Sequence, residues 1–431
     1  MTTQTLRTDL SADARAVAVR SILFVLILLL AWVSVDPFPN LDDPRRATIG
    51  DTADLVNQFA YVALAGSVAI YFLVHESWRL RPLVRPVYFA MLAWLAVSVA
   101  TSVYPALSAR RLIFAVLVIF LAAALPLLPS NLKRFCDLLA VVVIAILALC
   151  YAGVLLVPQL SIHQATDAVE PLLAGNWRGI FAHKNIAGVM MVNFIFFGLF
   201  IAKARNAIVG WPIVLAAGVF LYFAEAKSAT ALLPLVLVLS WAVERARSPA
   251  LGALLLLAPL IIATLFTIGS LHFEAIREIN EAVLSDPTFT GRNDIWQFAL
   301  DHIGERPWLG HGFGAYWETP ISYYQTAAVG SQATAASHAH NAFLDLAITI
   351  GIVGLLLAVL WTMVLPFLDF QRCKNAGAQP DLTRMFLRVW MFALYTCSFE
   401  SVLFNRGDPH WFTMLVAMFG LRYLSVSRLK R

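Results

Sequence analysis

Long apolar stretches alternate with shorter polar segments along almost the whole chain. Each is long enough for a helix that crosses roughly 30 Å of hydrocarbon. The stretches lie near residues 19–35, 55–74, 86–104, 111–128, 135–157, 186–203, 208–224, 227–243, 250–271, 341–365, 384–402 and 409–425. We therefore predict an all-α polytopic membrane protein with about twelve transmembrane helices, in which residues 1–431 form a single membrane domain.

Basic residues are concentrated in every second loop of this arrangement. If the N-terminus is cytoplasmic, most of the 31 Lys and Arg residues lie inside, including those of segments 79–85, 133–134, 203–205 and 245–247. Cytoplasmic loops of membrane proteins carry this excess of positive charge. The distribution predicts that both termini are inside, an N-in/C-in topology.

Composition excludes several other classes of protein. With 60% hydrophobic and 13% charged residues, the chain is too apolar for a set of soluble domains. The formal charge of +5 is not gathered in a basic run, so no nucleic acid is expected as a partner. The four cysteines lie in predicted helices or on the predicted inner side, so neither an outer disulfide nor a metal site is expected: Cys136, Cys150, Cys373 and Cys397.

Three polar segments of substantial length face outward on this topology: residues 36–54, 158–185 and 272–340. The third lies between the ninth and tenth helices and is predicted to be an external helical loop subdomain. Its stretches "HFEAIREINEAVL" and "NDIWQFALDHI" have apolar residues at helical spacing. We expect two amphipathic helices that lie against the outer membrane surface.

The second of these helices begins near Arg292, in "GRNDIW", where Asn293 or Asp294 could cap it. A helix N-terminus beside a guanidinium is well suited to bind phosphate. The alternative is a surface arginine that only solvates the loop.

Basic residues also lie at two other outer helix starts. In "GNWRGIFAHKNIAG", Arg178 and Lys184 come just before a helix whose expected cap is Asn185, and "AEAKSAT" places Lys227 at a tight hairpin. Positive residues are depleted on the outer side of membrane proteins, so these are candidates for binding an anion. Positive charges that merely anchor the helices at the membrane boundary are the alternative.

The stretch "SHAHNAFLDLAITIGIVG", residues 337–354, places two histidines against an apolar helix. Asn341 can cap that helix, which would hold His338 and His340 near its positive end. Neutral imidazole is favoured there, and this is the form that a general base needs. One or both histidines could instead simply cap the helix or lie at the interface.

Glu400 lies near the outer end of the eleventh predicted helix. An ionisable group in that position is a candidate for function. It could instead form a structural pair with Arg406, or it could orient a histidine. Together, the outer-face residues favour an anionic ligand whose lipid tail lies among the apolar helices.

These motifs resemble the bacterial O-antigen ligase and polysaccharide polymerase superfamily, and most closely its succinoglycan-type exopolysaccharide polymerases. The ligases have a histidine, then Asn, Ser or Gln, nine residues, Gly, two residues and Gly. Here His340 and Asn341 are followed by "AFLDLAITI" and then by Gly351 and Gly354. "WRGIFAHKN" and "GRNDIWQFALDHIGERPWLGHGFGAY" are similar to the family's arginine-bearing segment and large external loop.

The resemblance implies a metal-independent, inverting glycosyltransferase without a cofactor, in the bacterial inner membrane with its active site outside. The donor would be an undecaprenyl-pyrophosphate-linked glycan. Arg178 and Arg292 would hold the pyrophosphate, with Lys184 and Lys227 as further positive charges. His340 would activate the acceptor hydroxyl, supported by His338, Asn341 and Glu400.

The resemblance leaves the acceptor open. A polymerase adds the growing chain to a lipid-linked repeat unit, whereas a ligase transfers it to lipid A–core sugar. "EAKSA" and "SFESVLFNRGDPHW" look closer to the polymerases, and the histidine motif is usually described for ligases. A chain-length regulator is a further expected partner. A transporter of lipid-linked sugar is the alternative from another class, although no internal repeat is evident.

Overall fold

The computed structural model describes residues 3–33, 35, 37–41, 54–167, 171–284, 286–289, 291–317, 319–320 and 336–426. Throughout these ranges the regular elements are helices, and one isolated β-bridge joins Ile162 to Trp177. The predicted all-α polytopic class is confirmed.

Each predicted apolar stretch contains a helix. The α-helices are α1 (Thr3–Val33), α2 (Asp54–Tyr71), α3 (Pro86–Ala100), α4 (Pro105–Ala124), α5 (Leu132–Leu156), α6 (Lys184–Ala204), α7 (Ala207–Ala224), α8 (Lys227–Arg245), α9 (Pro249–Phe266), α10 (Glu274–Val283), α11 (Arg292–Glu305), α13 (Ala342–Val359), α14 (Leu365–Ala376), α15 (Pro380–Thr396) and α16 (Pro409–Val426). A π-helical turn, Leu360–Val364, joins α13 to α14. Nine spans in the described ranges are long and apolar enough to cross a membrane, and α3 is shorter. The number of crossings stays a prediction.

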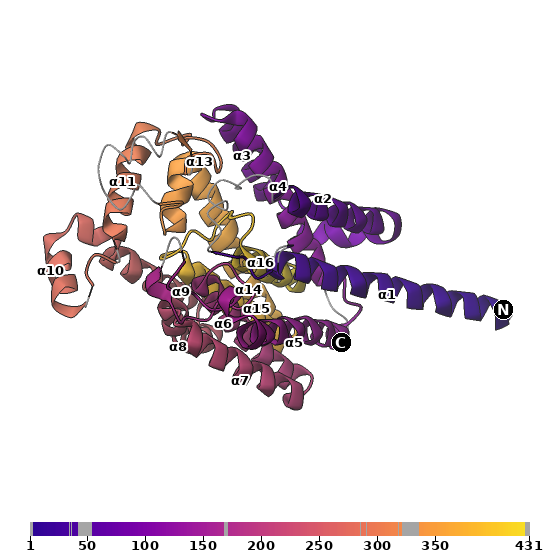
Figure 1. The fold of residues 1–431 in the computed structure, drawn as a ribbon. Coiled ribbons are helices and arrows are strands. Elements are labelled where there is room, and N and C mark those ends of the chain that lie inside the picture. Colours follow the sequence, from indigo (N-terminus) through magenta and orange to yellow (C-terminus); the bar gives the residue numbers. More distant parts are fainter. Residues whose placement is uncertain are drawn as a thin grey trace.

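Three helices form the centre of the bundle. α6 buries almost every residue from Ala187 to Ile201, and α15 and α16 are similarly enclosed. The outer helices instead expose large apolar side chains, among them Ile208, Leu215 and Ile261. Such side chains suit a hydrocarbon surrounding, since lipid replaces protein as their apolar neighbour. In Figure 1, α10 and α11 lie on the side of the molecule away from the two chain ends.

Both helices predicted for the external segment are confirmed, as α10 and α11. α10 leaves Ile279 and Val283 exposed, which is compatible with a helix at an interface. For α11 the prediction of a helix lying on the membrane is wrong. Its apolar side, including Trp296, packs in a separate core with Leu344 and Ile348 of α13. This packing fixes the start of α11 relative to the start of α13.

α13 contains a break at Gly351, whose backbone has φ 69° and ψ 178°. Carbonyl groups before a break lose their helical partners and need others. Residues 311 and 312 of the external segment supply them: the His311 amide donates to Ile348 O and the Gly312 amide to Thr349 O, both at 2.9 Å. The break therefore attaches the external segment to the transmembrane helix.

Close packing explains both glycines of the motif. A Cβ on Gly351 would lie 2.1 Å from Trp308 O, and its φ lies where L-residues are strained. A Cβ on Gly354 would lie 2.7 Å from Trp94 Nε1, whose indole donates to Ile350 O. Neither position has room for a side chain.

We predict that Gly351→Ala lowers the free energy of unfolding by about 2 kcal/mol or more, because strain and the clash with Trp308 O add. Thermal unfolding in detergent and limited proteolysis of the external segment would measure this. Gly304→Ala in α11 is the matched control, since nothing lies within 4 Å of that Cβ position. Equal stability of the two variants would contradict the account of the break.

Candidate functional site

The start of α13 is tied to the end of α15. The Ala342 amide donates to Cys397 O at 2.9 Å, and Asn341 Nδ2 donates to Ser398 O at 3.3 Å. α15 ends at Thr396, so Glu400 lies in the connecting segment beyond the helix. These bonds hold the carboxylate of Glu400 beside the histidines that precede α13.

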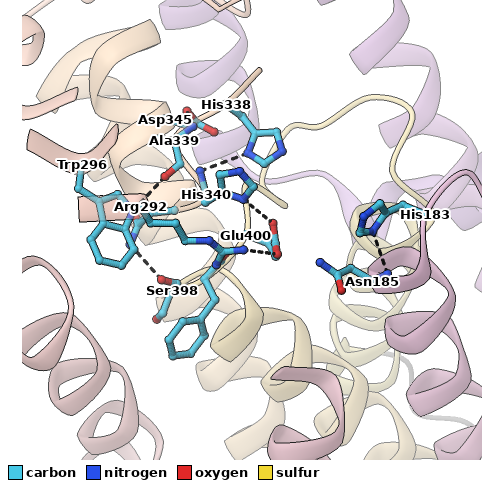
Figure 2. Close-up of polar contacts among 12 residues, drawn as sticks. His183, Asn185, Arg292, Trp296, His338, Ala339, His340, Asp345, Ser398 and Glu400 are labelled. Carbon is cyan, nitrogen blue, oxygen red and sulfur yellow. Dashed lines mark hydrogen bonds and ion pairs between the residues drawn. The ribbon is translucent and has the colours of Figure 1, made fainter. Parts of the chain in front are cut away.

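Three side chains from distant parts of the chain meet there (Figure 2). Arg292 Nη2 lies 3.0 Å from Glu400 Oε1, and His340 Nδ1 lies 3.1 Å from Glu400 Oε2. Arg292 also donates from Nη1 to Phe399 O at 2.6 Å. The ion-pair partner of Glu400 in the structure is thus Arg292, whereas the sequence suggested Arg406. The sequence also suggested that Glu400 orients a histidine, and the structure shows its contact with His340. We call Arg292, His340 and Glu400 the outer triad.

Asn341 caps α13 as predicted: its Oδ1 accepts from the amides of Phe343 and Leu344. His340 just before it has φ 47°, a left-handed conformation that histidine adopts more readily than bulky or β-branched residues. Its amide donates to His338 Nδ1 at 3.2 Å, and the two rings meet edge to face. The two histidines therefore have different environments.

The charge states of the neighbours of His340 follow from their surroundings. Burial, assisted by the nearby His340, lowers the pKa of His338 to about 4. Burial raises the pKa of Glu400, but the hydrogen bond from His340 and the charge of Arg292 outweigh it and bring the pKa to about 2. Near neutral pH, His338 is neutral and Glu400 is ionised.

An ionised carboxylate can only accept a hydrogen bond, so His340 Nδ1 must carry the proton that faces Glu400. In the neutral ring this leaves the lone pair on Nε2. Among the residues that the structure describes, none bonds to that atom, and the side chain is 28% exposed. His340 can accept a proton at Nε2 and keep the resulting charge next to Glu400.

We predict that His338→Asn leaves the acid limb of the pH–activity profile in place. With its pKa below the usual value, His338 takes up a proton only near pH 4, so it does not titrate between about pH 5 and 8. Initial rates across this range would test it, with wild type measured in parallel. A clear displacement of the acid limb in the variant would show that His338 titrates there.

Three further residues position the histidine loop, and the sequence reasoning missed them. Trp296 Nε1 donates to Ala339 O at 3.0 Å. Asp345 Oδ1 accepts from the Ala339 amide at 2.9 Å and from Trp317 Nε1 at 2.7 Å. The signal for Asp345 was available, since it is an acid within an otherwise apolar helix.

The predicted caps of two other helices are wrong. α6 begins at Lys184 and its cap is His183, whose Nδ1 accepts from the Asn185 amide. α11 begins at Arg292 directly after Gly291, and Asn293 and Asp294 lie inside its first turn. Both predictions failed for the same reason. Each helix begins one or two residues before the residue whose side chain is the better cap, so that residue lies inside the helix. The predicted place of Arg292, at the start of its helix after a glycine, is confirmed.

Arg178 is buried more deeply than expected for an arginine that contacts phosphate at the surface. It is 1% exposed, and it donates from Nη1 to Phe181 O at 3.0 Å and from Nη2 to Pro39 O at 2.8 Å. These bonds hold the segment before α6 against residues 37–41. Its predicted contact with pyrophosphate stays a prediction, and the structure gives it a positioning role.

The two predicted lysines lie at the α7–α8 corner. Lys184 Nζ lies 3.4 Å from Glu225 O, and Lys227 is the exposed first residue of α8. Phe196 in the middle of α6 packs on Phe392 near the end of α15, and Lys203 near the end of α6 pairs with Asp381 at the start of α15. The two helices are therefore antiparallel, and α6 begins at the end of the bundle where α15 ends. Figure 2 accordingly shows the start of α6 in the same view as the outer triad.

His338, His340 and Glu400 could also hold a metal ion, because their ligand atoms lie within 4.8 Å of one another. Two imidazoles and a carboxylate form a ligand set that iron and other transition metals accept. However, Arg292 already donates to Glu400, and the His338 Nδ1 atom accepts from the His340 amide. A cation would have to compete with the guanidinium for the carboxylate.

The helical bundle and the outer triad define a multi-pass membrane protein with a polar site at one end of its helices. A family model described as "O-Antigen ligase" matches residues 212–359. The chain is also 26% identical over 301 residues to the exopolysaccharide production protein ExoQ of Rhizobium meliloti (strain 1021), which covers 64% of this chain and 67% of the relative. These matches confirm the resemblance to the O-antigen ligase and polysaccharide polymerase superfamily that the sequence predicts.

The matched segment extends from α7 to the end of α13. It contains Arg292 and His340 but neither Glu400 nor Arg178. Glu400, which the sequence already suggested as a partner of a histidine, therefore joins the outer triad from outside the matched segment.

Proposed function

We propose that the protein is a glycosyltransferase that polymerises undecaprenyl-pyrophosphate-linked oligosaccharide repeat units into exopolysaccharide at the outer face of the bacterial inner membrane. The observation that carries this proposal is the outer triad, which brings together a histidine, a carboxylate in contact with its Nδ1 and an arginine at a helix start. Similarity to an exopolysaccharide production protein supports the same reading.

In the proposed reaction, His340 Nε2 takes the proton of an acceptor hydroxyl while that oxygen attacks the anomeric carbon of the donor. The new carbon–oxygen bond forms on the face opposite the pyrophosphate, so the anomeric configuration is inverted. The bond to the pyrophosphate oxygen breaks, and the lipid pyrophosphate leaves with the bonding electrons. Glu400 stabilises the imidazolium that forms and keeps the ring oriented.

Arg292 is suited to the leaving group. A guanidinium has five N–H donors, and toward the described residues Arg292 uses two of them, from Nη1 to Phe399 O and from Nη2 to Glu400. The remaining guanidinium donors can bind phosphate oxygens. Lys227 and Lys184 add positive charge at the α7–α8 corner. Arg178 holds the segment before α6 against residues 37–41, and its contact with the pyrophosphate stays a prediction.

We propose that these basic residues replace a divalent metal. Positive charge near the departing pyrophosphate is what a metal supplies in other glycosyltransferases. The competition of Arg292 for Glu400 supports this choice over a metal at His338, His340 and Glu400. Activity that persists after treatment with EDTA would support it, whereas loss of activity with recovery on adding a transition metal would overturn it.

A ligase that transfers the glycan to lipid A–core is the second candidate, and the O-antigen ligase match favours it. Purified protein should be given a lipid-linked donor together with a lipid-linked repeat unit, lipid A–core, or both. We expect a ladder of longer lipid-linked glycan with the repeat unit. Transfer only to lipid A–core would establish a ligase. A transporter would form no product with either acceptor. A chain-length regulator, if bound, would narrow the ladder.

We predict that Arg292→Ala lowers the rate with the lipid-linked donor by about 10²-fold, since one preorganised donor group in the transition state is lost. Arg292→Lys should recover only part of this, because an ammonium lacks the bidentate fork. Initial rates against donor concentration would measure both variants, with Arg277→Ala on exposed α10 as the control. Full activity of Arg292→Lys would show that positive charge alone suffices.

A further inference from the structure

A cavity of about 360 Å³ lies between α6, α7 and α15, far from the outer triad. Its lining consists of Phe196, Leu199, Phe200, Ala202, Lys203, Trp211, Asp381, Arg384, Met385 and Arg388. Lys203 near the end of α6 pairs with Asp381 at the start of α15, and α15 ends just before Glu400. Lys203 and the cavity therefore lie at the end of the bundle opposite the outer triad. On the predicted topology this is the cytoplasmic leaflet.

Most charges at the cavity are paired. Lys203 Nζ lies 2.8 Å from Asp381 Oδ1. Arg384 Nε lies 2.8 and 2.9 Å from the two oxygens of Glu244, so both carboxylates are engaged. The cavity therefore contains three cations and is balanced by two carboxylates, which leaves one positive charge in excess.

The excess charge belongs to Arg388. Its Nε donates to Ser240 Oγ at 3.3 Å, and among the described residues its guanidinium makes no ion pair. It lies about two helical turns inside α15, where an isolated charge is costly unless an anion or water accompanies it. An incoming anion would meet the free Nη groups of Arg388 at the cavity.

The other wall is apolar and continues onto the lipid-facing surface. Phe200 and Met385 line the cavity, and Trp211 beside them is 57% exposed. Ile208 and Leu215 on the same helix are exposed as well. A ligand that fits both walls has an anionic head and a hydrocarbon chain.

We propose that this cavity binds the phosphodiester headgroup of an anionic glycerophospholipid, with an acyl chain along Trp211. Basic pockets between transmembrane helices on the cytoplasmic side are suited to such headgroups. A zwitterionic lipid carries its own counter-charge and gains less from Arg388. The bound lipid joins α6, α7 and α15 at the end opposite the site.

Native mass spectrometry of the delipidated full-length protein, titrated with phosphatidylglycerol, tests this. We expect Arg388→Gln to weaken lipid binding by about fivefold, the effect of one basic residue near the membrane surface, and Arg388→Lys to weaken it less. Arg245→Gln is the matched control, because Arg245 is an exposed residue at the same end that packs over Trp241 outside the cavity.

Two further measurements distinguish an anionic lipid headgroup from a zwitterionic one and from free phosphate. Phosphatidylcholine in place of phosphatidylglycerol should bind more weakly and should be insensitive to Arg388→Gln. Inorganic phosphate should not displace the lipid at matched concentration. Equal phosphatidylglycerol binding by Arg388→Gln, Arg388→Lys and wild type, each folded by gel filtration, would overturn the proposal, as would full displacement by inorganic phosphate.

Discussion

His340→Ala is expected to lower the rate of glycosidic bond formation by about 10²- to 10⁴-fold while the protein stays inserted at its normal level, because the acceptor hydroxyl loses its general base. The loss should appear in the turnover rate more than in donor binding, since Arg292 and the start of α11 remain in place. Polymer yield in cells and initial rates with purified protein would both report it.

The matched control is His272→Ala, which removes an exposed histidine from the same external segment. This variant should keep wild-type activity and the same yield of inserted protein. Normal polymer from His340→Ala at equal protein level would remove His340 from the reaction.

Glu400→Gln is expected to cost about 10²-fold or more in turnover, although the side chain keeps its shape. A neutral amide cannot stabilise the imidazolium, and its NH₂ group can turn toward His340 Nδ1 and favour the wrong tautomer. Arg292 would also lose its ion-pair partner. Initial rates and thermal unfolding should be measured together, with exposed Glu278→Gln on α10 as control.

The double variant sharpens this test. If Glu400 acts through His340, then Glu400→Gln in a His340→Ala background should cost little more, because groups that act as a unit are not additive. Losses that multiply would assign Glu400 a separate role, for example through Arg292 alone.

The helices and several of their ends could be predicted from the sequence, because apolar length and helical periodicity are local properties. Asn341 as a cap and Arg292 at a helix start are examples, and both are seen in the structure. The caps of α6 and α11 failed because capping depends on where the helix begins, which tertiary contacts decide within a residue or two.

Partners across the chain could not be predicted in the same way. Glu400 has Arg406 as its basic neighbour in sequence, yet its pair is Arg292, which the packing of α11 on α13 brings to it. Arg178 looked like a surface cation because its segment is polar, but the backbone carbonyls that bury it come from residues distant in sequence. The sequence identifies chemically capable residues, whereas the fold decides which of them meet.

Gly351 was predictable from the sequence as a motif residue, but the reason for a glycine there was not. The spacing from His340 indicated a motif, but its physical reason is the approach of Trp308 and the hydrogen bonds from His311 and Gly312, which no local pattern reveals.

The most direct test of the central claim is a metal-free reaction of the purified protein with a lipid-linked repeat unit in detergent, in which released undecaprenyl pyrophosphate and new glycosidic bonds are counted together. The account predicts one lipid pyrophosphate for each bond in the wild type, with inverted anomeric configuration, and almost none of either with His340→Ala. Absence of any bond formation by the folded wild type, or equal rates for wild type and His340→Ala, would contradict it.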